Sequence, residues 1–458
     1  MVISLSEKRP AGRMQVTLDS APDPKRLAGT RNKTMSFTHS DSGILRDLAK
    51  RVAEIADDPA MVTRRQGWIE HNTLRSTYPM MLIFPEGSWC ELVPDSSLLC
   101  AGGRARNIEA ALWRTIYAFE HYQDDTVVDK SWIVNKIIGS TGWGLEAQWI
   151  RSPEARGTRQ FDPVIREPAD LGKLRHPKIA YDEESSLQTL VEMQELLGDI
   201  LTVKLEGVKR ISYHLMSQYT ALRGLKEVML DMYAEPQMLH DAMAFLEEGH
   251  RNVLKQYLEQ DLLSFNNGNT YHSSGGNSHT DELPQPDADP EHVCPQDMWA
   301  SAEAQEMAQV SPEHHAEFIL QYEKRLLEPF GLTGYGCCED LTRKLDDVFE
   351  IPHIRRISIS PWSDVDICSE KLKGDYIFSW KPHPAHLVGH FNPEAIREYI
   401  RHTVRVADGH GCVLEMILKD THTCEQQPDR FDEWTRIARE VILEETGRSP
   451  NQEVEATS

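Results

Sequence analysis

The chain has 458 residues, of which 40% are hydrophobic and 26% charged, as expected of a soluble globular protein. Its net charge of −23 argues against a nucleic-acid partner, because phosphates must be met by Lys and Arg side chains. No apolar run approaches the roughly 20 residues that span a bilayer, and the N-terminus lacks a secretory pattern. The eight cysteines are scattered, so we expect reduced thiols in a cytoplasmic protein with no membrane partner.

The first part of the chain is predicted to be a tail. Residues 1–42 are rich in Lys, Arg, Pro, Ser and Thr and hold few large apolar residues, so they cannot bury enough surface to become ordered. Apolar residues then recur at helical spacing from Ile44 to Ala56, which predicts an N-terminal helical extension. We therefore divide the chain into a disordered tail, 1–42, and one folded domain, 43–458.

Short apolar runs follow at intervals along the folded domain and predict buried strands. Eight such runs are centred near residues 81, 127, 202, 263, 332, 357, 378 and 415, and most precede a helical pattern. One helix is expected over residues 298–307. Alternating strands and helices form right-handed parallel units, so eight of them predict an α/β fold of the closed (β/α)8 TIM-barrel type. An open doubly wound sheet is the alternative. The nucleotide-binding form of that fold has little support, because no glycine-rich phosphate-binding loop follows any predicted strand.

Polar residues follow most of the predicted strands. In such barrels the active site is built at the carboxyl ends of the strands, so these residues are expected to share one cavity. In chain order they are Glu86; Asn266 and Asn267; Cys337, Cys338, Glu339 and Asp340; Ser360, Trp362 and Asp364; Lys381, His383 and His386; and Asp420, His422 and Cys424.

Two of these clusters have the composition of a metal site. Side chains alternate along a strand, so Asp420, His422 and Cys424 share a face, whereas only one of the neighbours Cys337 and Cys338 enters the cavity. Thiolate and imidazole ligands favour zinc, and an open fourth position makes such a site catalytic. The residue pattern does not decide which of Cys337 and Cys338 is the ligand. A buried Cys pair with a surface His is the simpler alternative.

Several motifs stand at or after the predicted strands: Asn266-Asn267-Gly268, Tyr335-Gly336-Cys337-Cys338-Glu339, Ser358-Ile359-Ser360-Pro361-Trp362, Lys381-Pro382 and Lys419-Asp420-Thr421-His422-Thr423. Together they resemble the uroporphyrinogen decarboxylase-like superfamily, close to its zinc-dependent, cobalamin-linked methyltransferases of the methylcobamide:coenzyme M type. The resemblance covers roughly residues 42–445 and implies a (β/α)8 barrel.

The sequence departs from the family at two places. The arginine signature of the haem-pathway decarboxylases is absent, because the first strand leads into Pro85-Glu86-Gly87-Ser88-Trp89. The methyltransferases place a His-x-Cys at the fifth strand and a Cys after the eighth. Here Tyr335 or Gly336 stands where the His should be, whereas Cys337 or Cys338 can match the first Cys and Cys424 the second. His422 or Glu339 would have to replace the missing His.

The leading hypothesis is a zinc-dependent methyltransferase that moves a methyl group between a corrinoid or other donor and a metal-bound thiol. The expected metal ligands are Cys337, Cys338, His422 and Cys424; the catalytic candidates are Glu339, Asp364, Lys381 and Asp420; the candidates for substrate binding are Glu86, Asn266, Asn267, Tyr335, Trp362 and His383. The expected cofactor is Zn2+, with a corrinoid carried by a partner protein. The alternatives are a metal-free lyase or decarboxylase of a carboxylated small molecule, and a non-catalytic ligand-binding barrel. The oligomeric state stays open, with a homodimer as one option.

Overall fold

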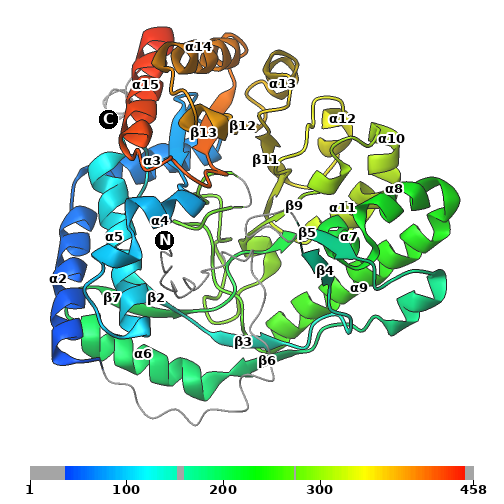
Figure 1. Ribbon diagram of the computed structural model, residues 1–458, viewed down its shortest axis with the longest axis horizontal. Coiled ribbons are helices and arrows are strands. Elements are labelled where there is room, and N and C mark those ends of the chain that lie inside the picture. Colours follow the sequence, from blue (N-terminus) through cyan, green and yellow to red (C-terminus); the bar gives the residue numbers. More distant parts are fainter. Residues whose placement is uncertain (1–36, 152–158, 273–274, 449–458) are drawn as a thin grey trace, which may run out of the picture.

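The computed structural model describes residues 37–151, 159–272 and 275–448, and places a parallel sheet at the centre with helices around it (Figure 1). The α/β class expected from the sequence is confirmed. Most of the predicted tail, residues 1–36, lies outside the described residues. The first helix already begins at His39, inside the range predicted as tail.

The central sheet has seven strands in the order β1-β13-β12-β11-β10-β9-β8, and every neighbouring pair is parallel. Its strands are β1 Met80–Ile83, β8 Ser212–Tyr213, β9 Trp299–Ala302, β10 Leu332–Tyr335, β11 Ile354–Ile359, β12 Ile377–Trp380 and β13 Val413–Leu418. Three two-stranded sheets complete the described strands: β2 Ser131–Asn135 with β7 Thr202–Glu206, β3 Ile137–Ser140 with β6 Ile179–Asp182, and β4 Gln148–Arg151 with β5 Arg159–Asp162.

The helices lie outside the sheet, as Figure 1 shows. They are α2 His39–Ala56, α3 Ala60–Asn72, α4 Trp89–Leu92, α5 Gly103–His121, α6 Glu183–Leu197, α7 Leu215–Arg223, α8 Leu225–Ala234, α9 Pro236–Glu259, α10 Pro312–His315, α11 Gln321–Leu327, α12 Leu345–Val348, α13 Val365–Leu372, α14 Pro393–Gly409 and α15 Asp429–Thr446. Within the described ranges, none of them is both long enough and apolar enough to cross a membrane.

The predicted helical extension is present as α2. The Thr38 side chain caps its first turn by accepting a hydrogen bond from the Asp41 backbone N–H. Its apolar face, which includes Leu45, Leu48 and Val52, is buried in a second hydrophobic core shared with α5 and α6. The helix is therefore ordered by packing of one amphipathic face.

The two faces of the central sheet differ in polarity. The face under the helices is apolar and buried, with residues such as Ile357, Phe378 and Leu414 in the main hydrophobic core. The opposite face carries small or polar residues in two rows: Ser212, Ser301, Gly334 and Arg356 are in register across β8 to β11, and Ser358, Ser379 and Glu415 are in register across β11 to β13. The polar rows leave one side of the sheet suited to a polar site, and side-chain alternation assigns every second residue to it.

The hydrogen-bonded strands of the described residues do not close into an eight-stranded ring. The run predicted near residue 127 forms no strand, although it lies beside β1. Its carboxylates take the place of a backbone ladder: Asp125 Oδ2 accepts from the Met81 N–H at 2.7 Å, and Asp124 Oδ2 from the Ile83 N–H at 3.1 Å. The run near residue 263 contributes only one bridge, Leu263 to Val208.

The prediction of a helix over residues 298–307 is wrong in its first half. Trp299–Ala302 forms β9, which pairs with β10 on one side and with β8 on the other. Position between two strands outweighs the helical spacing of a short apolar segment, whose periodicity is ambiguous by itself. A single 3-10 turn, η5 Gln305–Met307, follows.

Candidate functional site

The candidate site lies at the carboxyl ends of the central strands. The turn after β10 carries Cys337 and Cys338, and their sulfurs are 3.5 Å apart. The segment after β13 lies against this turn, with Lys419 Nζ 4.0 Å from Cys337 Sγ and Cys338 Sγ 3.7 Å from Asp420 Oδ2. The sequence prediction that these two segments meet is correct for these residues.

The cysteine turn is held by backbone and side-chain contacts. Gly336 adopts a φ of +95°, which disfavours any residue with a Cβ, and a Cβ there would lie 2.8 Å from a Leu341 methyl carbon. Ser358 Oγ donates to the Cys337 carbonyl at 2.9 Å. The Glu339 carboxylate accepts from the Cys337 N–H at 2.8 Å and from the Ala304 N–H at 3.1 Å. The turn is thus fixed to β11 and to the segment after β9.

The two thiols have opposite electrostatic environments. The hydrogen bond with Cys338 lowers the pKa of the Cys337 thiol, and the Lys419 charge lowers it further, against the effect of burial. The same hydrogen bond, followed by burial, raises the pKa of Cys338. Burial opposes the charge on Lys419, but Tyr271, Cys337 and Asp420 raise its pKa overall. The arrangement favours a Cys337 thiolate paired with the Lys419 cation.

Several buried or half-buried acidic side chains follow the strands near the turn. Burial and the nearby charge of Glu303 raise the pKa of Glu339, and the same two causes raise the pKa of Glu306 to about 7. Burial likewise raises the pKa of Glu86, which follows β1, against the charge of Lys419. A carboxyl whose pKa lies near neutrality, as that of Glu306 does, is suited to general acid catalysis.

Lys381 follows β12 on the polar face of the sheet. Its ammonium is buried and donates to the Ser379 carbonyl at 2.9 Å and to Ser379 Oγ at 2.8 Å. Burial lowers the pKa of Lys381 to about 7, although the Glu415 carboxylate opposes this shift. The side chain is therefore a candidate for proton transfer as well as for binding an anion.

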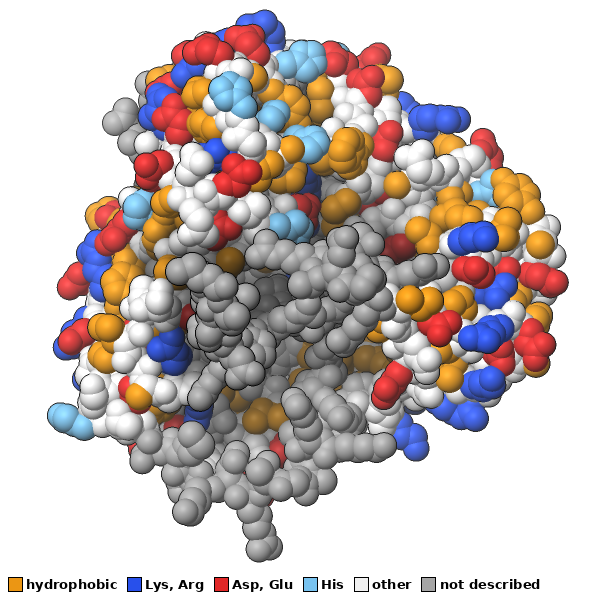
Figure 2. Space-filling view, viewed as in Figure 1, with side chains coloured by type: hydrophobic (Ala, Val, Ile, Leu, Met, Phe, Trp, Pro, Cys, Tyr) orange, Lys and Arg blue, Asp and Glu red, His pale blue; other side chains and the backbone are white. Residues whose placement is uncertain are grey.

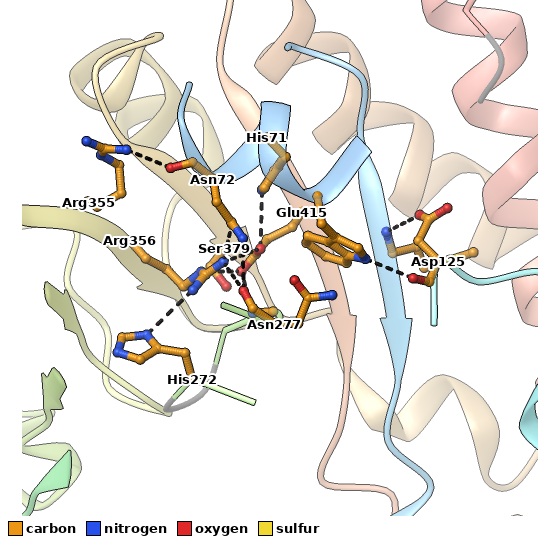
Figure 3. A network of polar contacts seen from close by, with 12 residues as sticks. His71, Asn72, Asp125, His272, Asn277, Arg355, Arg356, Ser379 and Glu415 are labelled. Atoms are coloured by element: carbon orange, nitrogen blue, oxygen red, sulfur yellow. Dashed lines mark hydrogen bonds and ion pairs between the residues drawn. The ribbon is translucent and has the colours of Figure 1, made fainter. Parts of the chain in front are cut away.

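The same face of the sheet carries a buried ionic network, which lies nearer to the amino-terminal ends of the strands than Lys381 does. Figure 3 shows this network. Arg356 Nε lies 3.1 Å from Glu415 Oε1, and the Arg356 guanidinium also donates to Asn72 Oδ1 at 2.6 Å. His71 Nε2 lies 3.2 Å from the second Glu415 oxygen, and the Gly276 N–H donates to the first at 2.8 Å. These contacts join the end of α3 and the segment after residue 275 to the sheet, and they fill its interior below the site.

The expected zinc ligands are only partly brought together. Cys337 and Cys338 are adjacent, but the buried Cys424 thiol donates to Glu91 Oε2 at 3.1 Å, and burial raises the pKa of Cys424 to about 11. His422 is exposed. Over the described ranges, no group of three or more His, Cys, Asp or Glu side chains is placed to hold a metal ion. In this arrangement the predicted donor set does not fit a zinc ion.

Three residues predicted to bind substrate make hydrogen bonds that connect segments of the fold. The Asn266 amide is buried and bridges two chain segments: it accepts from the Trp299 N–H at 2.9 Å and donates to the Trp299 and Lys209 carbonyls at 2.9 and 2.8 Å. Asn267 donates to the Leu283 carbonyl at 2.7 Å. Tyr335 lies on the helix side of the sheet, where its hydroxyl contacts Glu323 Oε2 at 2.9 Å and His315 Nε2 at 2.8 Å.

The remaining predicted residues lie at the rim. Asp364 caps α13 by accepting from the Asp366 and Ile367 N–H groups, so a structural role accounts for it. His383 Nδ1 accepts from the Ala385 N–H, and its ring lies edge-on to the exposed Trp362 with centroids 5.0 Å apart. Figure 2 shows histidine and hydrophobic side chains together on the part of the surface near α14 and the ends of β12 and β13.

The structure adds residues that sequence reasoning missed. His214 follows β8, Glu303 follows β9, and the half-buried Tyr271 lies close enough to Lys419 for each to shift the pKa of the other. His214 Nδ1 is in hydrogen-bond contact with Glu303 Oε1. Recognising β8 and β9 as strands would have placed both residues at strand ends with the others.

A separate pocket of about 290 Å³ lies at the opposite, amino-terminal edge of β10 and β11. Glu282, His353 and Arg355 contribute to its lining, and the Arg355 guanidinium lies 2.9 Å from Glu282 Oε2. None of the predicted site residues lines it.

No protein-family model matches the chain, and no curated protein matches its sequence. Among solved structures, a methyltransferase from Methanosarcina mazei matches with a TM-score of 0.33 and 10% identical residues, covering 58% of this chain and 72% of that chain. A likeness at this level assigns no activity, so the function rests on the geometry of the site.

Proposed function

We propose that the chain is an enzyme that transfers a methyl or other small carbon group, and that the Cys337 sulfur accepts this group. The observation that carries the proposal is the position of Cys337 at the carboxyl end of the sheet, 3.5 Å from a second thiol and 4.0 Å from the Lys419 ammonium. A thiolate stabilised by a cation in a half-buried site is a strong nucleophile.

In the proposed step, a lone pair of the Cys337 thiolate attacks the electrophilic carbon of the donor. The S–C bond forms while the bond from that carbon to its leaving group breaks, and the leaving group keeps the electron pair. Where the leaving group is basic, a protonated side chain at the strand ends supplies a proton. A methylated corrinoid carried by a partner protein is the donor that the sequence resemblance implies, and its leaving group needs no proton.

A single-turnover experiment tests this proposal. The protein is incubated with methylcobalamin, and cysteine methylation is assigned to individual peptides by mass spectrometry. We expect methylation at Cys337 and its loss in Cys337→Ser, while Cys90→Ser, which removes an exposed thiol, leaves the Cys337 signal unchanged. Methylation confined to Cys90, or none at all, would contradict the proposal.

Zinc remains a proposal from the resemblance, and no step above is routed through it. Metal analysis of the purified protein beside Cys424→Ala tests it. One zinc per chain that is lost in the variant would show that Cys424 leaves Glu91 to join a metal site.

A metal-free carboxy-lyase is a second candidate, favoured by the basic side chains Lys381 and Lys419 and by the raised pKa values of Glu86, Glu306 and Glu339 at the same end of the sheet. There the cations would bind the substrate carboxylate, the C–C bond would break with loss of CO2, and an acid would protonate the carbanion. A carboxy-lyase activity would persist after chelation and in Cys337→Ser, but it would be lost in Lys381→Met. Transfer to Cys337 predicts the opposite for Cys337→Ser, where activity would be lost.

A further inference from the structure

Two residues outside every predicted cluster, His214 and Glu303, form a hydrogen-bond contact at the same end of the sheet as Cys337. The parallel pairing of β8 with β9 aligns Ser212 with Ser301 and Tyr213 with Ala302. The Glu303 N–H continues this ladder by donating to the Tyr213 carbonyl at 3.2 Å. The next residues in register are therefore His214 and Glu303, and alternation places both on the polar face of the sheet.

Glu303 is fixed in place. Its side chain is 2% exposed; Oε1 contacts His214 Nδ1, and Oε2 accepts from the Gln305 N–H at 2.9 Å. His214 is 36% exposed, and Nε2 is the ring nitrogen that Glu303 does not use. A buried carboxylate on Nδ1 and a more exposed imidazole is the arrangement that orients a catalytic histidine.

The His214–Glu303 dyad is joined to the cysteine turn through the residues that flank Glu303. The Gly336 N–H donates to the Ala302 carbonyl at 3.0 Å, and the Ala304 N–H donates to Glu339 Oε1 at 3.1 Å, so the residues on both sides of Glu303 contact the turn. Burial opposes the charged form of His214, but the Glu303 contact outweighs it, and the negative charge of Cys337 also raises the pKa of His214. The other groups facing the ring are Arg210, before β8, and His250 on α9, whose pKa falls to about 4 through burial and the His214 charge.

We propose that His214, oriented by Glu303, is the acid–base group of the Cys337 site. His214 Nε2 takes the proton from the Cys337 thiol, which leaves a thiolate and an imidazolium paired with the Glu303 carboxylate. When the sulfur forms its bond to the donor carbon, the imidazolium returns the proton to a basic leaving group. His214 is thus a catalytic residue and Glu303 a positioning residue. The role rests on the proposed function, because it serves the same sulfur.

The test measures the rate at which iodoacetamide alkylates Cys337 at neutral pH, resolved by peptide mass spectrometry, with Cys90 of the same chain as internal control. His214→Asn is the informative variant, because its amide can still donate to Glu303 but has no counterpart of Nε2. We expect His214→Asn to slow alkylation of Cys337 by about 10²-fold, the lower end of what a positioned base contributes, and to leave Cys90 unchanged. Glu303→Gln should shift the pH at half-maximal rate.

Chemical rescue distinguishes catalysis from packing. His214→Gly should lose the Cys337 rate in the same way and regain it as imidazole is added, whereas a purely structural His214 predicts that His214→Asn behaves like the parent and that imidazole has no effect. Either of these last results overturns the proposal. If alkylation depends on His214 but methylcobalamin does not methylate Cys337, the dyad stands and the proposed transfer reaction fails.

Discussion

At the scale of single residues, the neighbours of a cysteine decide its chemistry. Cys337 has a thiol and a cation beside it, whereas Cys424 is buried against the carboxylate of Glu91. Strand alternation and strand-end position predicted that the two polar segments meet, and they do so through Lys419 and Asp420. The Glu91 contact could not be predicted, because it joins residues 333 positions apart through the tertiary fold.

Removing the Lys419 charge should make Cys337 less reactive at neutral pH. Since Lys419 helps to lower the pKa of the thiol, Lys419→Met should shift the pH dependence of Cys337 alkylation to higher pH, with a slower rate near pH 7. The measurement is the pH–rate profile for iodoacetamide, resolved by peptide. Lys371→Met, which removes a cation paired with the exposed Asp346, serves as control; equal profiles for parent and Lys419→Met would refute the assignment.

At the scale of elements, the sequence predicted the strands that form long apolar runs. It did not predict which segments lie beside the sheet and are hydrogen-bonded to it through side chains. The runs near 332, 357, 378 and 415 form β10 to β13 because their backbones pair directly. The segments near 127 and 263 fall beside the sheet without regular ladders. At these places Asp124, Asp125 and Asn266 supply the hydrogen bonds that a neighbouring strand would supply. A polar side chain at a strand end can therefore bind a substrate or complete the hydrogen bonding of the fold, and the contacts of Asn266 are of the second kind.

Asn266→Ala should lower the stability of the protein, rather than act by weakening substrate binding. The substitution leaves the buried Trp299 N–H and carbonyl without the hydrogen bonds that Asn266 makes to them, and each unsatisfied group costs about 1–3 kcal/mol. We expect a lower free energy of unfolding in urea. Asn392→Ala, which removes an exposed cap of α14, should cost only about 1 kcal/mol. Equal stability of the two variants would show that water replaces the Asn266 amide.

At the scale of the whole molecule, the polar face of the sheet connects two regions of different character. Toward the carboxyl end it carries the reactive groups, and toward the other end it is closed by the network of Arg356, Glu415 and His71. Ser379 and Lys381 lie between them, and Glu415 contributes to the pKa of Lys381. The network was not foreseen, because apolar runs conceal a single buried charge such as Glu415 within β13. The ion pair of Arg356 with Glu415 and the hydrogen bonds around it offset the cost of burial, since an isolated buried charge is strongly unfavourable.

The position of Lys381 between these regions makes the stability of the whole chain depend on pH. Burial lowers its pKa from 10.5 to about 7, so between these values the unfolded chain binds a proton that the folded chain does not. Stability from this group therefore rises with pH across that window, by about 1.4 kcal/mol per pH unit, and is constant outside it. Lys381→Met removes the dependence, so its advantage over the parent should be largest near pH 7 and should shrink toward pH 10.5.

Urea unfolding of parent and variant at several pH values measures this difference. Lys255→Met, at an exposed position, should keep the pH dependence of the parent. A constant difference between parent and Lys381→Met across the window would mean that Lys381 stays charged when folded. Lys381 would then act only as a cation for a substrate anion and not as a proton donor or acceptor.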